Sequence, residues 1–403
     1  MALYLNPNAD AFQEDKKTRI YIDKSLLIAE LNNIVSTKDD FICISRPRRF
    51  GKSMAGNMIS AYYSKGCDTR DIFSQMKLGQ CPDYDKYLNK FNVIKLDLNG
   101  WYQRSIQRNR VDSLIIDIHE ALVDDFKEAF PFLSFKTNNI TLDQCILNVY
   151  AKTGEKFVII IDEYDVLVRE QVPQSLFDSY LSFLNGLFKD TAIRPAIALA
   201  YITGIIPVVR DKVQSKLNEF TEYTMLRSGH LSGYFGFTKE EVTDLCTQYG
   251  MDREECARWY DGYRLTETIE VYNPLSVVSA MRNQEFGSYW SATGSFEALK
   301  DYIMMDFNGI KQDVIKMISG ESVPVNVTKF QNTLQSITNK DNAFTYLIHL
   351  GYLSYDRKEK TCKIPNEEVR LEWINAIDDE ENYAPIMEII NASKRLLDAT
   401  VAG

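Results

Sequence analysis

One stretch constrains the fold of this chain more than any other: an apolar segment that runs through a short loop into Gly51, Lys52 and Ser53. Residues 41–45 are mostly apolar and indicate a buried strand, whereas apolar side chains recur at helical spacing after Ser53. The end of the loop completes the GxxxxGK[ST] pattern, which is typical of phosphate-binding loops between a strand and a helix. The sequence therefore predicts a phosphate-binding loop at residues 46–53.

The residue types in this loop suit phosphate chemistry. Gly51 lets backbone N–H groups close around an anion, Lys52 can reach the β- and γ-phosphates, and the Ser53 hydroxyl can hold Mg²⁺. Arg46 departs from the pattern, because it stands where the first Gly is expected, and the loop is basic and stiff. For Arg48 and Arg49, a solvated position in a basic loop is the alternative. We predict that the nucleotide is bound by Arg46, Pro47, Arg48, Arg49, Phe50, Gly51, Lys52, Ser53 and Met54.

A second motif supplies acidic partners for the loop. Residues 157–161 are apolar and largely β-branched, and they end at Asp162 and Glu163. This pattern predicts a central parallel strand whose carboxyl end presents acids, where open α/β sheets bind ligands. We expect Asp162 to hold Mg²⁺ with Ser53, and Glu163 to align or deprotonate the attacking water. A buried strand that runs into an ordinary acidic turn is the alternative, and Asp165 fits a turn or helix cap.

Further strands complete the predicted sheet. Apolar or alternating segments near residues 92 and 196 indicate strands, and helical patterns separate them from the two motifs, so we expect a parallel α/β sheet with helices on both faces. A fifth short strand is expected near 223–226. In a P-loop NTPase of the additional-strand type, the strand ending at Thr203 lies between the loop strand and the acid strand. Thr203 would then sense the γ-phosphate, as would Arg210; a strand-ending Thr and a surface Arg are the alternatives.

The sequence changes character beyond residue 230. We expect an ATPase domain at 1–230, a mainly helical lid-like region at 231–300 and an α/β or winged-helix-like module at 301–403. Thr238 and Glu241 form a capping-box pattern, and a helix at 343–350 precedes a predicted hairpin. The chain stops directly after an amphipathic helical pattern at 385–399. We therefore expect that the native chain continues, or that a following domain has been removed.

Composition excludes several classes of protein. The length of 403 residues suggests two or three domains, and the formal net charge of −10 argues against a generally basic nucleic-acid-binding surface, though not against a local patch. The seven cysteines are scattered without metal-ligand spacing, which favours a reducing cytoplasm and no structural zinc. No apolar run approaches the roughly 20 residues that span a bilayer, so we predict no membrane partner, and with the cysteine pattern we predict a cytoplasmic protein.

Taken together, the motifs resemble the predicted AAA-ATPase-like proteins of gut and anaerobic bacteria, and the resemblance covers nearly the whole chain. In that family the first Gly of the loop is also replaced by Arg, so Arg46 looks like a family trait. The resemblance also implies a C-terminal domain similar to PD-(D/E)XK nucleases, which residues 1–403 do not display. The matching segments are 21–24 (YIDK), 45–53 (SRPRRFGKS), 157–165 (FVIIIDEYD), 202–207 (ITGIIP), 217–223 (LNEFTEY), 235–237 (FGF), 259–263 (WYDGY), 272–274 (YNP), 348–353 (IHLGYL) and 364–370 (IPNEEVR).

These observations lead to two main hypotheses. The first is an ATPase that uses ATP and Mg²⁺, with Glu163, Lys52, Thr203 and Arg210 as catalytic residues, and that serves as a switch or motor for an attached effector domain. The second is a non-hydrolysing nucleotide-binding scaffold whose C-terminal region binds DNA or a protein. A nuclease-associated role in defence or in a mobile element rests on the family analogy alone. A homo-oligomer is compatible with either hypothesis.

Overall fold

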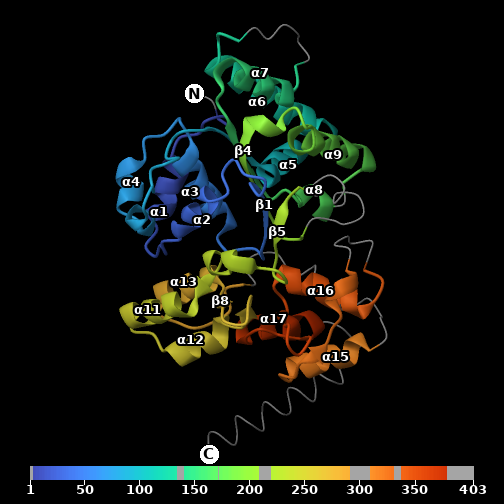
Figure 1. The fold of residues 1–403 in the computed structure, drawn as a ribbon. Coiled ribbons are helices and arrows are strands. Elements are labelled where there is room, and N and C mark those ends of the chain that lie inside the picture. Colours follow the sequence, from blue (N-terminus) through green and yellow to red (C-terminus); the bar gives the residue numbers. More distant parts are fainter. Residues whose placement is uncertain are drawn as a thin grey trace, which may run out of the picture. The chain divides into compact units, whose positions relative to one another are not determined.

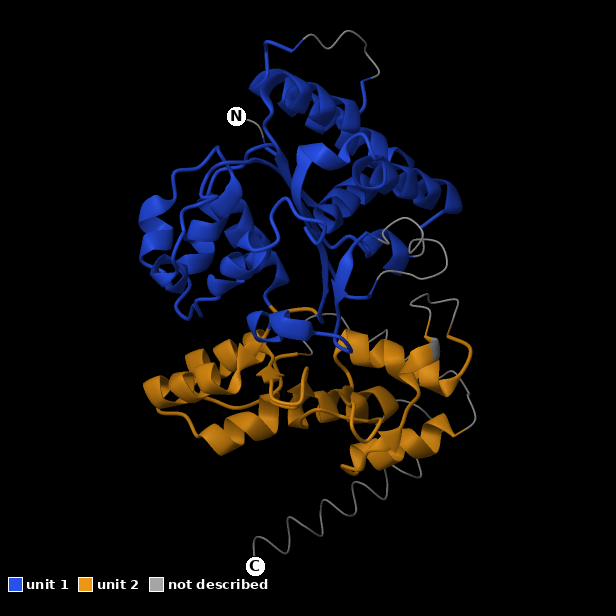
Figure 2. Ribbon diagram, viewed as in Figure 1, with its two compact units in different colours: residues 1–47, 51–235, 331–334 blue, residues 48–50, 236–330, 335–403 orange. Residues whose placement is uncertain are grey.

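The computed structural model describes residues 3–133, 140–170, 172–207, 219–290, 309–330 and 337–378. The chain divides into two compact units (Figure 2). Within the described ranges, unit 1 takes in residues 3–47 and 51–235, and unit 2 takes in residues 48–50 and those from 236 onward. The limits of the three domains expected from the sequence stay a prediction.

Unit 1 is built around a five-stranded parallel sheet. The strands are β1 (Phe41–Ser45), β2 (Asn92–Asp97), β3 (Phe157–Asp162), β4 (Ile197–Gly204) and β5 (Thr221–Tyr223), in the order β2-β3-β4-β1-β5. The predicted strand order is confirmed, because β4 pairs with β1 on one side and with β3 on the other. Parallel pairing brings the carboxyl ends of these three strands to one edge of the sheet. Thr203 of β4 lies opposite Ile44 of β1 in the register.

Helices cover both faces of this sheet (Figure 1). Alternate residues of each strand point to opposite faces, so Phe41 and Cys43 of β1 join one core while Ile42 and Ile44 join the other. The first core packs under α5 (Leu98–Gln107), α6 (Leu114–Ala129), α7 (Leu142–Thr153) and α9 (Gln174–Phe188). The second packs under α1 (Asp10–Lys16), α2 (Leu26–Asn32), α3 (Lys52–Tyr63) and α4 (Arg70–Ser74). The short helix α8 (Val166–Arg169) follows β3.

Unit 2 is mainly helical and also contains two small antiparallel sheets. The predicted capping box of Thr238 and Glu241 opens its first helix, and Asn273 caps the helix that begins at Pro274. The helices are α11 (Lys239–Tyr249), α12 (Arg253–Tyr260), α13 (Pro274–Asn283), α15 (Ile310–Ile318), α16 (Lys340–Leu350) and α17 (Glu367–Asp378).

The strands of unit 2 differ in part from the expectation. The predicted hairpin is present as β10 (Ser354–Asp356) and β11 (Thr361–Lys363), and β9 (Val323–Pro324) adds a third strand to it. Besides its helices, the lid-like region contains a sheet that the sequence does not predict, formed by β6 (Phe237–Thr238), β8 (Glu270–Tyr272) and β7 (Tyr263–Arg264). These strands have two or three residues, which is too short for a periodic pattern in the sequence. The winged-helix assignment stays a prediction.

Some expectations fall on parts of the chain that the structure does not describe. Arg210, the segment 291–300 of the lid-like region and the amphipathic pattern at 385–399 lie outside the described residues. Among the helices that are described, none is both long and apolar enough to cross a bilayer.

Candidate nucleotide-binding site

The phosphate loop ends in a helix whose N-terminus is open. Gly51 occupies the N-cap position of the 12-residue helix α3 with φ +83°, and no side chain caps the helix. A Cβ at Gly51 would meet no atom within 4 Å, so the space beside this residue is open. Arg49 also has a left-handed backbone, with φ +70°, whereas Arg46 does not. The missing first Gly is therefore tolerated, because the loop does not need a positive φ at that position.

Lys52 lies inside the loop rather than in solvent. Its Nζ donates hydrogen bonds to the carbonyl oxygens of Arg46 at 2.9 Å and Pro47 at 2.8 Å. Burial lowers the pKa of Lys52 to about 8, against the opposing effect of the nearby acids Asp162, Glu163 and Asp165. A buried ammonium beside an open helix N-terminus is suited to an anion, whose charge it would compensate.

Arg46, the unusual residue of the loop, is turned into the interior. The side chain is completely buried, and its Nη1 donates to the carbonyl oxygens of Ser45 at 2.9 Å and Tyr223 at 3.0 Å. The guanidinium carbon also lies 5.7 Å from the centre of the Phe235 ring. The contacts of this side chain tie β1 to the end of β5, and its part in phosphate binding stays a prediction.

The remaining loop residues differ in their exposure to solvent. Pro47 and Phe50 are buried, and the Phe50 ring makes a T-shaped contact with Tyr263 inside unit 2, with ring centroids 5.2 Å apart. Arg48 is half-buried, whereas Arg49, Ser53 and Met54 are exposed. The exposed Ser53 hydroxyl on the first turn of α3 is therefore accessible to a metal ion.

The acid strand and the strand ending at Thr203 meet at the same edge of the sheet. The Thr203 hydroxyl donates a hydrogen bond to Oδ1 of Asp162, and the backbone N–H of Glu163 reaches the same oxygen at 3.0 Å. Thr203 is completely buried. The contact orients the Asp162 carboxylate through a neutral donor, which leaves the negative charge available to a cation.

Glu163 has a partner that the sequence analysis did not identify. Arg169 of α8 donates from Nη2 to Oε2 of Glu163 at 2.6 Å, and its Nε lies 3.3 Å from Oδ2 of Asp165. Burial raises the pKa of Glu163, and the Arg169 guanidinium works in the opposite direction. No sequence motif links an acid to an Arg six residues later. This pair is therefore visible only in the packing of the turn.

Asp165 plays a different part from the one expected. It stands at the N-cap position of α8, but its side chain makes no capping bond there. Instead, Oδ2 accepts hydrogen bonds from the backbone N–H groups of Ile205 and Ile206, both at 2.9 Å. Tyr164 supports the same connection, because its hydroxyl donates to the Ile206 carbonyl at 2.9 Å. The acidic turn after β3 is thus fixed to the segment that follows Thr203.

A second unpredicted group lies beside Asp162. Lys95 is a charged residue between the buried apolar residues Ile94 and Leu96 of strand β2, and its Nζ donates to Oδ1 of Asn57 on α3. Asn57 in turn donates to Oδ2 of Asp15 at 2.8 Å. Burial lowers the pKa of Lys95, and the charge of Asp162 opposes that change. A lone Lys between buried strand residues was the available signal in the sequence.

The residues present fit a magnesium–nucleotide complex. Mg²⁺ usually takes one or two protein oxygen ligands and completes its shell with water and phosphate. Ser53 and Asp162 carry oxygen atoms of the kind that Mg²⁺ takes, and their joint binding of Mg²⁺ stays a prediction. The described residues contain no group of three or more His, Cys, Asp or Glu side chains arranged to hold a metal ion, and a two-ligand Mg²⁺ site does not require one.

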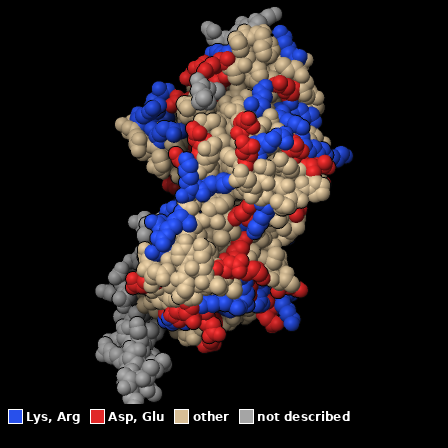
Figure 3. Space-filling view, turned by 90° about the vertical axis from the view of Figure 1, so that its left-hand side faces the viewer, with Lys and Arg blue, Asp and Glu red and all other residues tan. Residues whose placement is uncertain are grey.

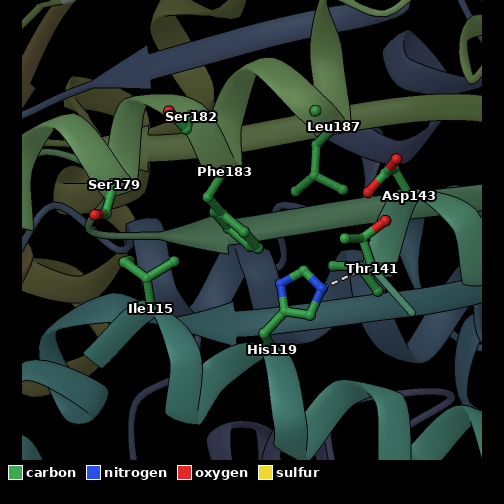
Figure 4. A pocket seen from close by; sticks show the side chains of 10 residues that line it. Ile115, His119, Thr141, Asp143, Ser179, Ser182, Phe183 and Leu187 are labelled. Atoms are coloured by element: carbon green, nitrogen blue, oxygen red, sulfur yellow. Dashed lines mark hydrogen bonds between the residues drawn. The ribbon is translucent and has the colours of Figure 1, made fainter. Parts of the chain in front are cut away.

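A separate cavity of about 220 Å³ lies between α6, α7 and α9 (Figure 4). His119 lines it, and Nε2 of His119 accepts a hydrogen bond from the backbone N–H of Leu142 at 2.7 Å. Burial lowers the pKa of His119, which favours this neutral acceptor. The cavity shares no lining residue with the phosphate loop or the acid strand.

Comparison with known proteins agrees with this architecture. The model of the family described as "Predicted AAA-ATPase" matches residues 10–214, just over half of the 403 residues. The chain belongs to this family. The matched segment contains the phosphate loop, the acid strand and Thr203, and membership of the family suggests ATP binding.

A curated relative gives no further functional information. It is the "Uncharacterized protein in vnfD 5'region" of Azotobacter chroococcum mcd 1, which is 25% identical over 267 residues. The alignment covers 64% of this chain and 48% of the relative, so the chain spans about half the length of the relative it matches.

Proposed function

We propose that this protein binds Mg-ATP at the phosphate loop and hydrolyses it, and that the cycle serves as a switch or motor for an attached effector domain. The observation that carries the proposal is the hydrogen bond from Thr203 to Asp162, made possible because β4 lies between β3 and β1. It supports a shared site formed by three strand ends: the loop after β1, the acids after β3 and the polar end of β4.

Each residue has a distinct role in this proposal. Lys52 and the N–H groups at the start of α3 bind the β- and γ-phosphates, and Ser53 and Asp162 hold Mg²⁺. The metal ion supplies neutralisation of the phosphate charge when it is bound. Glu163 aligns or deprotonates the attacking water. Thr203 holds Asp162 and responds to the γ-phosphate.

A Glu163→Gln variant tests the proposal. In the ATPase, this change should lower turnover on the order of 10²–10⁴-fold and leave Mg-ATP affinity close to that of the wild type. Turnover is measured by phosphate release, and affinity is measured separately by calorimetry. A variant that hydrolyses ATP at the wild-type rate would contradict the assignment of Glu163.

The alternative is a non-hydrolysing nucleotide-dependent scaffold. The buried Arg46 is the observation that favours it, because an ordinary phosphate-binding loop has glycine at that position. The scaffold would bind Mg-ATP without turnover in the wild type and in Glu163→Gln alike.

The partner of such a scaffold, DNA or a protein, is part of the proposal. The face drawn in Figure 3 carries Lys and Arg as well as Asp and Glu on both units, so on this side no single sign of charge dominates. The cytoplasmic location and a homo-oligomeric state are likewise proposals. Native mass spectrometry with and without Mg-ATP tests the oligomer.

A further inference from the structure

We propose that Arg169 is a positioning residue for hydrolysis: it holds the Glu163 carboxylate in the orientation from which Glu163 addresses water. The proposal rests on the function proposed above and adds a residue that neither motif contains. The contact between Arg169 Nη2 and Glu163 Oε2 is short, at 2.6 Å, and the two side chains are 8% and 25% exposed. Charge-assisted bonds of this length are about twice as strong as neutral ones.

Arg169 can orient Glu163 because Arg169 is itself anchored. Its Nε lies 3.3 Å from Oδ2 of Asp165, a side chain that is only 1% exposed. The same Asp165 oxygen accepts the backbone N–H groups of Ile205 and Ile206. The contacts therefore run from the segment after Thr203, through Asp165 and Arg169, to Glu163.

The backbone of Glu163 is fixed as well, which leaves its side chain as the movable part. Glu163 has φ +52°, an uncommon conformation for a non-glycine residue. The turn is closed by the hydrogen bond from Tyr164 N–H to Thr203 C=O, at 2.9 Å, and from Val166 N–H to Glu163 C=O, at 3.1 Å. The Glu163 carboxylate can rotate on this rigid turn, so its hydrogen bond with Arg169 sets its direction.

The charges around Glu163 make Arg169 necessary for that direction. Asp162 and Asp165 repel the carboxylate, whereas Lys52 and Arg169 attract it. Without Arg169, the remaining attraction comes from Lys52, which belongs to the phosphate loop. The carboxylate would then lose the hydrogen bond that fixes its direction.

The test compares kcat and the Mg-ATP dissociation constant in Arg169→Met, Arg169→Lys, Glu163→Gln and the double variant Glu163→Gln/Arg169→Met. Arg169→Met should lower kcat on the order of 10²-fold, the size expected for a misplaced catalytic group. The dissociation constant should stay within about threefold, because the interaction is used in the chemical step. Arg169→Lys keeps the positive charge, but a lysine cannot bridge two acids as the planar guanidinium group does. The kcat of Arg169→Lys should therefore lie between those of Arg169→Met and the wild type.

The double variant identifies Glu163 as the group through which Arg169 acts. In the Glu163→Gln background, Arg169→Met should cause no further loss of kcat. Arg194→Met is the matched control, because Arg194 also pairs with a buried acid, Asp40, just before β1 and away from the site. This control should retain wild-type kcat.

Several outcomes would overturn the proposal. They are an unchanged or increased kcat in Arg169→Met, an equal loss of kcat in the wild-type and Glu163→Gln backgrounds, or a loss of Mg-ATP affinity alone. If Arg169→Met does not fold, Arg169→Lys decides by the same comparison, and wild-type kcat in that variant overturns the role. Failure of the proposed function has a different signature, in which Glu163→Gln itself keeps the wild-type rate.

Discussion

Replacing Gly204 by Ala tests whether the acidic turn and the end of β4 are packed as tightly as the structure indicates. A Cβ at Gly204 would lie 2.6 Å from Cε1 of Tyr164, 2.8 Å from Oδ1 of Asp165 and 2.9 Å from Cγ of Asp165. Neither neighbour can yield easily, because the Tyr164 hydroxyl and the Asp165 carboxylate are both bonded to the segment 205–206.

The expected loss in free energy of unfolding follows from the three close approaches of the added Cβ. Overpacking of a fixed core by one methyl group costs about 1–3 kcal/mol, and the three close approaches place Gly204→Ala toward the upper part of that range. Gly56→Ala is the matched control in helix α3. Its added Cβ would lie 3.8 Å from Cγ2 of Ile160, an ordinary contact. Ala is favoured over Gly inside a helix, so this control should gain about 0.5–1 kcal/mol.

Urea unfolding followed by circular dichroism measures both changes. We predict that the free energy of unfolding falls in Gly204→Ala and rises in Gly56→Ala. Gly204→Ala with wild-type stability would refute it, since the turn would then be able to move away from the added methyl group.

Two further predictions concern the metal ligand and a buried acid of unit 2. Asp162→Asn should weaken the Mg²⁺-dependent part of ATP binding by at least about tenfold, because loss of even a second-shell partner of a metal ion costs at least that much. Calorimetry of ATP binding with and without Mg²⁺ measures this change. Equal Mg²⁺ dependence in the wild type and the variant would contradict the assignment of Asp162. Burial raises the pKa of Glu368 from 4.5 to about 7, although hydrogen bonds from Tyr289, Trp290 and Ser276 oppose the shift. The folded state therefore holds this proton where the unfolded state has released it, so stability should fall as pH rises between those values, by up to about 3 kcal/mol. Glu368→Gln should lack this loss, so its free energy of unfolding in urea, relative to that of the wild type, should be more favourable at pH 8 than at pH 5. An equal difference between the two proteins at both pH values would contradict the prediction.

The arrangement of the site's main chain was largely predictable from the sequence. Long apolar segments near residues 41, 157 and 196 have few alternatives to buried parallel strands. The predicted strand order follows from placing the phosphate loop and the acids at the same edge of the sheet. Thr203 was found because a polar residue at the end of a buried strand stands out against its neighbours. The contact of its hydroxyl with Asp162 then agrees with the expected convergence.

The side-chain network was not predictable, because its partners are set by packing rather than by spacing. Arg169 reaches Glu163 only because a left-handed residue turns the chain after β3. The sequence predicts no bond between Arg46 and Tyr223, because the guanidinium reaches this carbonyl across more than 170 residues of chain. The sheet of β6, β8 and β7 is not predictable for another reason, since strands of two or three residues carry no periodic signal.

Calorimetric titration of Mg-ATP into the wild type and Lys52→Ala tests the central claim most directly. Lys52 Nζ bonds two loop carbonyls beside the open end of α3. Lys65→Ala is the control, because Lys65 pairs with Glu155 away from the loop. We predict saturable binding to the wild type and to Lys65→Ala, and an affinity at least about tenfold lower in Lys52→Ala, a difference of about 1.4 kcal/mol. Equal affinities in all three proteins would contradict the assignment of residues 46–53 as the phosphate-binding loop.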